Sequence, residues 1–348
     1  MRLQPNQRRE RVLEQVRELG RATVVDLAAA FGVSAVTMRQ DVEELESRGE
    51  LRRTPETVLP VNAAALRSEE LTLGMVLPNT EYYFSDIIDS ARRTAAAHGA
   101  RLVVSTTRYA PEQDAVQADK LLADGADGLI LIPSWPTGEA GPGDGWILDK
   151  DVPTVLAERW VPPLHPLARL DRVSTDHGHG IGLAVQRLAD QGHRRILLTV
   201  VNNLYARRLG TAYRAALEAL DLAGSALPPL VTVSELPERE RRDQLLESLC
   251  SAIAEHEVTA VVMHTGLDAV VTVPRLLSRG IRIPEDLAVI AYDDEVAELA
   301  DVPLTSIATP KHAVGATAAE LLLRRIADPA ASPHHAELMP ELRVRDSG

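Results

Sequence analysis

Near the N-terminus, apolar residues recur at helical spacing in three segments separated by short breaks. Val12, Val16 and Leu19 lie on one face of the first segment, and Gly20 then predicts its end. The stretch VVDLAAAFG predicts a second, short helix, and a turn at Gly32 precedes a third helix in SAVTMRQDVEELESRG. Three helices with a tight turn between the second and the third predict a helix-turn-helix.

The third predicted helix has one apolar face and one face that suits DNA. At about 100° per residue, Met38, Val42 and Leu45 fall together and should pack inward. The opposite face offers an arginine for guanine, a glutamine for adenine and a valine for a thymine methyl group, while a threonine on its flank suits a phosphate. The predicted DNA-binding residues of this helix and of its N-cap are Ser34, Val36, Thr37, Arg39 and Gln40.

After Gly49, the stretch ELRRTPETVLPV alternates apolar and polar residues across a turn at Thr54 to Glu56. This pattern predicts a small β-hairpin wing. Arg52 and Arg53 lie on the wing, and we expect them to contact phosphates or enter the minor groove. A winged helix-turn-helix is therefore predicted over residues 1–60.

From residue 71 onward, apolar runs alternate with helical patterns. The runs are LTLGMVLP, RLVVSTT, DGLILIPS, PTVLAE, RRILLTVV, PLVTV, TAVVMHT and DLAVIAYD. Repeated strand-helix units predict an α/β domain with parallel sheets covered by helices, and about ten strands predict two lobes. The expected parts are a linker at 61–70, a first lobe at about 71–160 and 296–326, and a second lobe at about 161–295 and 327–348.

The residues that follow the apolar runs are aromatic, basic, amide-bearing or acidic. Ligands of open α/β sheets bind beyond the carboxyl ends of the strands, where these residues lie. Aromatic faces stack on sugar-like rings and polar groups bond hydroxyls, so a polyhydroxylated effector is predicted. The predicted effector-binding residues are Tyr83, Phe84, Ser134, Trp135, Arg159, Arg207, Arg208, His264, Asp268 and Asp293.

The charge distribution weakens a simple electrostatic argument for DNA. The net charge is −13, but residues 1–60 carry ten arginines against ten acidic residues, which leaves 27 basic and 40 acidic residues in the remainder. A neutral head lacks the basic patch typical of DNA-binding domains, so the prediction rests on pattern.

Other chemistries find little support in the sequence. No apolar run approaches the roughly 18 residues of a membrane span, and the N-terminus lacks the apolar core of a signal peptide, so a cytoplasmic protein is expected. The single cysteine, Cys250, excludes an intrachain disulfide. Asp293 with Asp294 could form a metal site or a catalytic pair, but adjacent strand residues point to opposite faces. The HGHG stretch at 177–180 could bind zinc, but its i, i+2 spacing puts the two histidines on different sides of a helix, so neither a metal nor a cofactor is predicted.

Residues 7–58 resemble the DeoR family of regulators. The resemblance is carried by RRERVLEQV, VVDLAAAFGVS, VTMRQDVEELESRGEL and the Arg-Arg that follows. Gln40 stands where that family more usually has a second basic residue, and TPETV replaces its Gly-rich wing, so the base preference stays open.

Residues 71–347 resemble the LacI/GalR family, whose effector domain is periplasmic-binding-protein-like. The matching stretches are LGMVLPNTEYYF, GADGLILIPS, VSTDHGHGIGLAVQRLADQGHRRI, YARRLGTAYRAAL, GIRIPEDLAVIAYDD, PLTSIATP and ELRVRDS. The resemblance implies effector contacts from Arg207, with Arg208 as a competitor, and from Asp293. It also implies a wall under the ligand at Tyr83 and Phe84.

One departure from that family concerns the site. His264, Thr265 and Gly266 replace the usual Ala-Asn-Asp, which removes a carboxylate offered to sugar hydroxyls, although Asp268 follows two residues later. A DeoR-type head before this type of sensor is also an unusual combination.

The predicted function is a transcription regulator, more specifically a repressor. A homodimer or a dimer of dimers would bind double-stranded operator DNA, and effector binding between the lobes would change the spacing of the two heads. One alternative is an α/β sugar or phosphosugar enzyme fused to a DNA-binding head, which would show turnover of such compounds. Another is a scaffold whose sensor has lost its ligand, motivated by the missing carboxylate.

Overall fold

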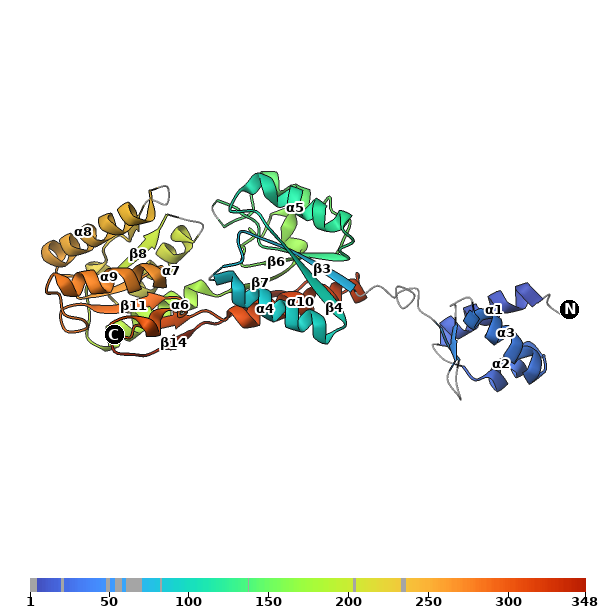
Figure 1. Cartoon of the computed structure of the whole chain (residues 1–348). Helices are drawn as coiled ribbons and strands as arrows, with labels where there is room; N and C mark the ends of the chain where they lie inside the picture. The colour runs from blue at the N-terminus through green and yellow to red at the C-terminus, as the bar shows by residue number, and fades with distance from the viewer. Residues whose placement is uncertain are drawn as a thin grey trace. The chain divides into compact units, whose positions relative to one another are not determined.

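The computed structural model describes residues 5–19, 22–47, 51–53, 58–60, 71–81, 83–136, 138–202, 205–232 and 236–348 (Figure 1). Internal contacts divide the chain into two units, Met1–Glu70 and Leu71–Gly348. The predicted linker at 61–70, the wing turn at Thr54 to Glu56 and Gly20 lie outside the described residues.

The N-terminal unit is a helix-turn-helix with a two-stranded hairpin. Its elements are α1 (Pro5–Leu19), α2 (Val24–Phe31), α3 (Ala35–Ser47), β1 (Leu51–Arg53) and β2 (Val58–Pro60). The strands are antiparallel, with Leu51 opposite Pro60. Gly32 ends α2 in the left-handed conformation with φ of 64°, which glycine adopts without steric cost. The three predicted inward residues of α3, Met38, Val42 and Leu45, are buried in the core of this unit.

A buried carboxylate fixes α3 against α1. Asp41 is 2% exposed and accepts from Arg8 Nε at 2.5 Å and Arg9 Nε at 3.0 Å. These paired charges tie the two helices together on the inner side of α3. The rotation of α3, and hence the set of its side chains that face outward, follows from this pair and from the apolar core.

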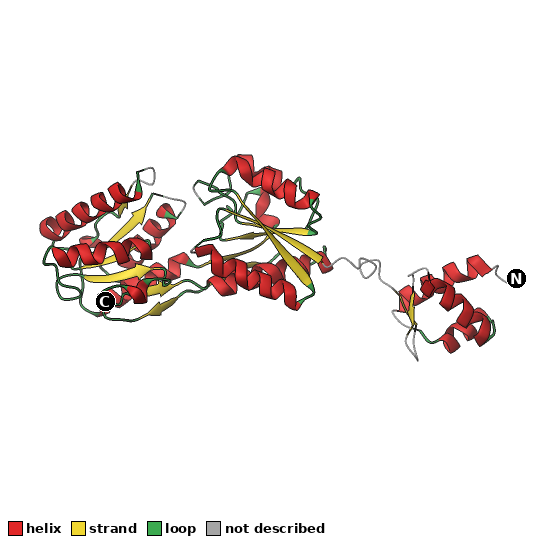
Figure 2. Ribbon diagram, in the orientation of Figure 1, coloured by secondary structure: helices red, strands yellow, loops and turns green. Residues whose placement is uncertain are grey.

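The second unit has two lobes, each built on a six-stranded sheet (Figure 2). The first sheet has the order β13-β7-β6-β5-β3-β4, and every neighbouring pair in it is parallel. Its strands are β3 (Leu71–Leu77), β4 (Ala100–Thr106), β5 (Gly128–Leu131), β6 (Thr154–Ala157), β7 (Asp171–Thr175) and β13 (His335–Leu338). Its helices are α4 (Tyr83–Ala97), α5 (Pro111–Ala123), α10 (Lys311–Ala327), η1 (Pro142–Ile147) and η2 (Pro166–Arg169).

The second sheet has the order β14-β12-β11-β10-β8-β9, and β14 is its antiparallel member. Its strands are β8 (Ile196–Val201), β9 (Leu230–Thr232), β10 (Ala260–Met263), β11 (Ala288–Tyr292), β12 (Thr305–Ala308) and β14 (Glu341–Arg343). Its helices are α6 (His177–Asp190), α7 (Ala206–Ala219), α8 (Glu238–His256), α9 (Gly266–Ser278), η3 (Ala223–Ser225) and η4 (Ala297–Leu299). Strands such as β10 are buried along their whole length, as expected for parallel strands covered on both faces.

The chain crosses between the lobes three times, and each crossing lies later than predicted. The crossings follow β7, β12 and β13, at Asp176, at 309–310 and at 339–340. The predicted lobe boundaries, near 160, 295 and 326, are therefore corrected. The reason is that β7, β12 and β13 are short and mix polar with apolar residues, so no apolar run marks them as strands.

Helices α4 and α10 pack closely on one face of the first sheet (Figure 1). A Cβ atom at Gly315 would lie 2.1 Å from the Ile87 carbonyl oxygen and 2.2 Å from Ser90 Oγ. Only glycine permits this approach of the two helices. The contact holds the start of α10, and with it Lys311, against the first lobe.

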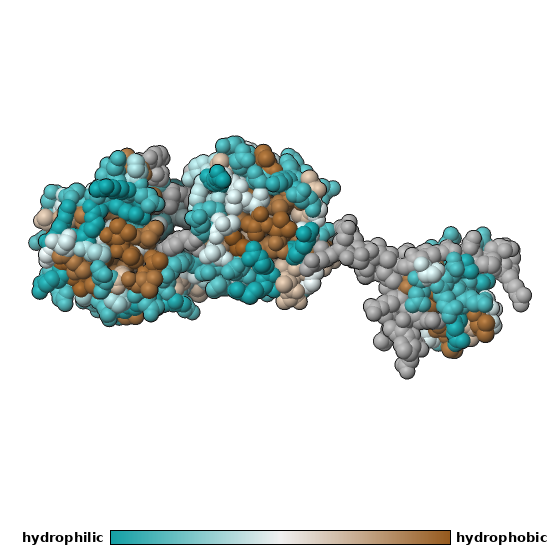
Figure 3. Space-filling model, in the orientation of Figure 1, coloured by the Kyte–Doolittle hydropathy of each residue, from teal (hydrophilic) through white to brown (hydrophobic). Residues whose placement is uncertain are grey.

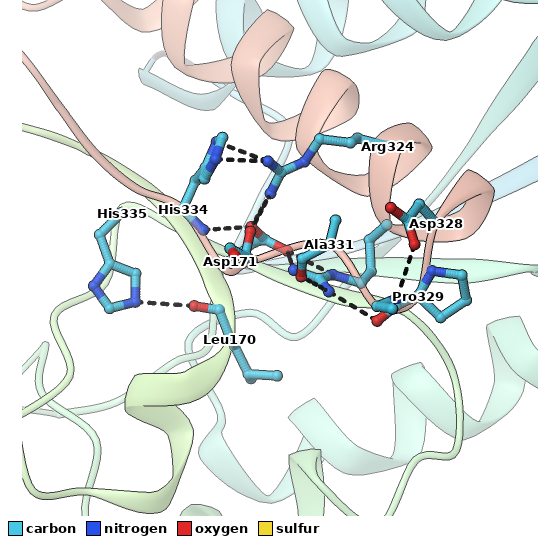
Figure 4. A network of polar contacts seen from close by, with 11 residues as sticks. Leu170, Asp171, Arg324, Asp328, Pro329, Ala331, His334 and His335 are labelled. Carbon is cyan, nitrogen blue, oxygen red and sulfur yellow. Dashed lines mark hydrogen bonds and ion pairs between the residues drawn. The ribbon is translucent and has the colours of Figure 1, made fainter.

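Asp171, at the start of β7, is the centre of a charged network (Figure 4). Its side chain is fully buried and accepts from Arg324 Nη2 at 2.7 Å, Arg325 Nε at 2.9 Å and the His334 backbone amide at 2.7 Å. Arg324 and Arg325 lie in the last turn of α10, and His334 precedes β13. One carboxylate therefore joins three segments that are distant in sequence. It lies at the start of a strand, at the opposite end from the lobe crossings.

The surface of the second unit mixes polar with apolar patches, and Figure 3 shows apolar surface on the visible face of both lobes. No helix in the described part of the chain is long and apolar enough to span a membrane.

Candidate functional site

The outer face of α3 carries the side chains predicted to read DNA. Val36 is 64% exposed, and Arg39 and Gln40 are exposed beside it. Neither Arg39 nor Gln40 has a polar partner among the described residues. Ser34 Oγ accepts from the Thr37 amide at 3.1 Å and lies 2.8 Å from Thr37 Oγ1, so both residues shape the first turn of α3. An exposed valine with unpaired hydrogen-bonding groups is suited to a partner surface.

The wing is present as the β1–β2 hairpin. Arg52 and Arg53 belong to β1, where they pair with Leu59 and Val58, but their side chains lie outside the described residues. Their role in DNA contact stays a prediction.

A narrow pocket lies in the second unit where the chain passes from the first lobe to the second. It is lined by Gly138, Glu158, Arg159, Trp160, Ser174, His177, Tyr205 and Arg208. The first five belong to the first lobe and its loops. Of the other three, which belong to the second lobe, His177 begins α6, Tyr205 directly precedes α7 and Arg208 lies in α7. The pocket therefore receives residues from both lobes at the carboxyl ends of β6 and β7, which is the position expected for a ligand site.

Glu158 is the buried carboxylate of this pocket. Its Oε1 accepts from the Thr175 amide at 3.1 Å and from Thr175 Oγ1 at 2.9 Å, while Oε2 lies 3.5 Å from His177 Nε2. Burial by itself would raise the pKa of Glu158, but its contacts with His177 and Thr175 lower the pKa below its ordinary value. Glu158 is thus an ionised hydrogen-bond acceptor, and its Oε2 has no hydrogen-bond partner among the described residues.

Four aromatic rings form a closed set of contacts in the second lobe beside this carboxylate. The ring of His177 lies 4.7 Å from that of Tyr205 and 5.8 Å from that of Tyr292, and His264 lies 6.4 Å and 5.7 Å from the same two tyrosines. His177 Nδ1 is also 2.8 Å from Tyr292 Oη. The set is a rigid apolar surface with polar atoms at its edges.

His264, which was predicted as a site residue, lies in this aromatic set. Burial, and to a smaller degree the charge of His177, lowers the pKa of His264 to about 4. His264 is therefore neutral at pH 7, and its Nδ1 has no hydrogen-bond partner in the described part of the chain.

The lowered pKa of His264 predicts a loss of stability in mild acid. An unfolded histidine takes up its proton near pH 6.5, whereas folded His264 does so near pH 4, so stability present above about pH 6.5 is lost as the pH falls toward 4. Between pH 7.5 and 5 this site lowers the free energy of unfolding by about 2 kcal/mol. In His264→Phe, which keeps an aromatic ring, that loss should be about 2 kcal/mol smaller by urea denaturation. Equal losses in both proteins would contradict the burial of a neutral His264.

Asp293 and Asp294 have different partners. Asp293 is buried, has φ of 81° and accepts from Thr309 Oγ1 at 3.1 Å. Burial raises the pKa of Asp293, although the charge of Lys311 opposes this shift. Asp294 instead accepts from Arg345 Nη1 at 2.7 Å and also pairs with Arg343, both near the C-terminus.

Lys311 brings the start of α10 to the same region. It pairs with Glu295, and its Nζ lies 5.0 Å from the centre of the Tyr83 ring. Tyr83 Oη is in turn 3.5 Å from Thr175 Oγ1, the hydroxyl that donates to Glu158. Tyr83 is therefore linked through Thr175 to the pocket. Glu158 and Asp293 both have a positive φ, 52° and 81°, a backbone strain that clusters at functional sites.

Several predicted effector residues lie elsewhere and are corrected. Asp268 is 1% exposed, accepts from Arg241 at 2.5 and 2.9 Å and from Arg242 at 3.1 Å, and so anchors α9 to α8. Phe84 and Trp135 belong to the apolar cores of the first lobe. Ser134 is buried, with its amide donating to Asp114 Oδ2 at 2.8 Å and its hydroxyl 2.6 Å from Thr107 Oγ1. In each case local packing directs the side chain into the interior of its own lobe.

The two candidate arginines of α7 have different surroundings. Arg207, favoured by the family resemblance, has a side chain 69% exposed and pairs with Glu139 across the lobes. Arg208 lines the pocket, 5.5 Å from the centre of the Trp160 ring. Gly138 and Glu139 belong to the loop that follows β5, which is rich in glycine and proline. The loop is held on Trp160 because the Trp160 amide donates to the Gly138 carbonyl at 3.1 Å.

The sequence reasoning missed Glu158, His177, Tyr205, Tyr292 and Lys311 as site residues. Glu158 ends the run PTVLAE, and Tyr205 lies a few residues beyond RRILLTVV, so their positions after apolar runs were a signal for them. His177 directly follows β7, which was not recognised as a strand. Tyr292 and Lys311 reach the site only through the tertiary fold.

The chain matches known families at both ends. The model of a DeoR-like helix-turn-helix domain matches residues 8–56, and the model of a periplasmic binding protein-like domain matches residues 185–348. The HTH-type transcriptional repressor PurR of Vibrio cholerae serotype O1 (strain M66-2) is 30% identical over 344 residues, covering 94% of this chain and 98% of that protein. The ribose operon repressor of Escherichia coli (strain K12) is 27% identical over 343 residues, covering 94% and 99%.

A solved structure, a complex of the transcriptional regulator CelR with cellobiose, is similar with a TM-score of 0.67 and 24% identity, covering 94% of this chain and 100% of that chain. At this identity the likeness supports the fold alone. The family assignment rests instead on the match to the PurR repressor, which covers nearly the full length of both chains. The chain belongs to the LacI family of transcription regulators, with a periplasmic-binding-protein-like domain behind a DeoR-like helix-turn-helix head.

Proposed function

We propose that this regulator is a repressor whose operator affinity is set by a small polyhydroxylated effector bound between its two lobes. One observation carries the proposal: Glu158 of the first lobe and His177 and Tyr205 of the second line one pocket, next to a chain crossing. A ligand that contacts both sides favours one angle between the lobes over others. A ligand shifts the equilibrium between two lobe arrangements only if it binds one of them more tightly than the other.

The chemistry of the pocket supports a sugar-like ligand. The ionised Glu158 accepts hydroxyl protons, and the rings of Tyr205 and Trp160 offer faces for stacking. Asp293, Tyr83 and Arg208 supply further polar groups in our proposal. The names of the similar proteins point the same way, since one is a ribose operon repressor and another was solved with cellobiose.

The DNA side of the proposal rests on α3. Val36, Thr37, Arg39 and Gln40 would enter the major groove, and the hairpin arginines Arg52 and Arg53 would contact the backbone. A homodimer is proposed because paired half-sites call for two-fold symmetry, and apolar surface on both lobes offers area for a second copy (Figure 3). A regulator of this kind would act in the cytoplasm, where operator DNA lies.

Linkage between effector and operator is the test of this function. A DNA sequence is first selected with the full chain, and the effector is sought by thermal shift with mono- and disaccharides. We expect the effector to change operator affinity by some 5- to 150-fold, and operator DNA to change effector affinity by the same factor. Fluorescence anisotropy and calorimetry measure the two sides. A bound sugar that leaves operator affinity unchanged would contradict the coupling.

The alternatives make different predictions. A sugar or phosphosugar enzyme would turn over the compound that it binds, and the curated relatives, which are repressors, do not favour it. A scaffold with a silent sensor would show no thermal shift with any compound. The unpartnered polar atoms of the pocket, Glu158 Oε2 and Arg159 Nη2, favour a working sensor over a silent one.

A further inference from the structure

Arg159 is a buried cation without a carboxylate partner. It is 2% exposed, its Nε donates to the Pro133 carbonyl and its Nη1 donates to the Glu158 carbonyl at 2.7 Å. Its Nη2 is buried and has no partner among the described residues. A buried guanidinium is costly unless an opposite charge compensates it.

The nearest acids are engaged elsewhere. The Asp114 carboxylate accepts from the Ser134 amide at 2.8 Å and makes no ion pair with Arg159. The carboxylate of Glu158 is directed to Thr175 and His177, as described above. Glu139 pairs with Arg207. Glu139 and Glu158 are thus directed to other residues. Asp114 makes no ion pair with Arg159, although the charge of Arg159 partly opposes the rise in the pKa of Asp114 that burial causes, and the hydrogen bonds of Arg159 go to neutral carbonyls.

A second guanidinium lines the same pocket. Arg208 lies over the Trp160 ring and makes no ion pair in the described part of the chain. The pocket thus holds two arginines, one from each lobe, that make no ion pair among the described residues. Burial raises the pKa of Tyr205, and the charge of Arg159 opposes that shift, so Arg159 acts across the pocket on the second lobe.

We propose that the effector is an anionic sugar derivative, whose phosphate or carboxylate group binds Arg159 and Arg208 while its hydroxyls bind Glu158. The inference rests on the proposed function, because it names the ligand class of the same pocket. Planar guanidinium groups bind oxyanions through paired, charge-assisted hydrogen bonds. One oxyanion between Arg159 and Arg208 would supply a counter-charge to both arginines and so draw the two lobes together.

Inorganic phosphate is the first probe, because it needs no knowledge of the sugar. The melting temperature of the full chain is followed by Trp fluorescence in phosphate and in chloride at equal pH and ionic strength. Phosphate also stabilises proteins in general through exclusion from the surface, so variants are compared with the wild type. Arg208→Met removes a half-buried cation. Arg159→Lys keeps the buried positive charge but loses the paired N–H donors of the planar guanidinium group. Arg214→Met, on the exposed face of the same helix α7, is the matched control.

We expect a phosphate-specific rise in the wild type and in Arg214→Met, with at least about tenfold more phosphate needed in Arg208→Met and in Arg159→Lys. No specific rise in the wild type would overturn the proposal, and so would a wild-type response in both pocket variants. This measurement contains no DNA. Its result is therefore independent of whether effector binding changes operator affinity, and the two proposals can fail separately.

Matched sugars then distinguish the two oxyanions. Calorimetry compares ribose with ribose 5-phosphate, and glucose with glucose 6-phosphate and glucuronate. Tighter binding of a phosphate ester by at least about tenfold assigns a phosphate, and the same preference for glucuronate assigns a carboxylate. A neutral sugar that binds as tightly as its charged partner contradicts the proposal. Should none of these sugars bind, the phosphate measurement decides.

Discussion

The double variant Arg39→Ala/Gln40→Ala is expected to bind the selected operator on the order of 100-fold more weakly than the wild type. Both side chains are exposed on the outer face of α3, while the opposite face is buried in the core. Each good side-chain contact with a base contributes about 1–3 kcal/mol of discrimination, and the two contributions add when the bases are separate. Fluorescence anisotropy with the selected operator and a scrambled duplex measures the change.

The control for this variant is Arg11→Ala. Arg11 is exposed on α1, so its loss removes one charge from the same unit without touching α3. We expect its operator affinity to stay within about threefold of the wild type. The double variant should also lose its preference for the operator over the scrambled duplex. Retained preference would show that α3 does not read the bases, and the proposed DNA contact would have to be abandoned.

Asp171→Asn is expected to lower the stability of the second unit by about 3–5 kcal/mol, because it removes the buried carboxylate that compensates two half-buried guanidinium groups. Asp171 has a fully buried side chain and holds Arg324, Arg325 and the His334 amide (Figure 4). All three tryptophans lie between residues 135 and 160. Urea denaturation followed by Trp fluorescence therefore reports on the second unit alone.

The matched control for this prediction is Asp89→Asn on α4. Asp89 pairs with Arg92 at 3.0 Å, but both side chains are more than half exposed. An exposed pair contributes about 0–1 kcal/mol, so this variant should unfold close to the wild type. Similar small effects for both variants would mean that Asp171 does not compensate the two arginines in the folded protein.

The amino-acid sequence alone determined the head and the class of the second unit. Local signals are sufficient there: apolar residues at helical spacing place Met38, Val42 and Leu45 in the core, and Gly32 ends α2. The apolar runs that form β3, β5 and β10 marked buried parallel strands in the same way. These features depend on neighbours in sequence, so a linear pattern contains them.

The tertiary structure decided which residues meet at the pocket. His177 and Tyr292 are 115 positions apart in the sequence, yet His177 Nδ1 lies 2.8 Å from Tyr292 Oη. The two residues meet because His177 follows β7 of the first sheet and Tyr292 ends β11 of the second. Asp268 turns toward Arg241 because α8 packs beside α9, and no spacing along the chain predicts that direction. Short strands of mixed polarity, such as β7 and β13, form only because neighbouring strands supply their hydrogen bonds, and the lobe crossings follow them.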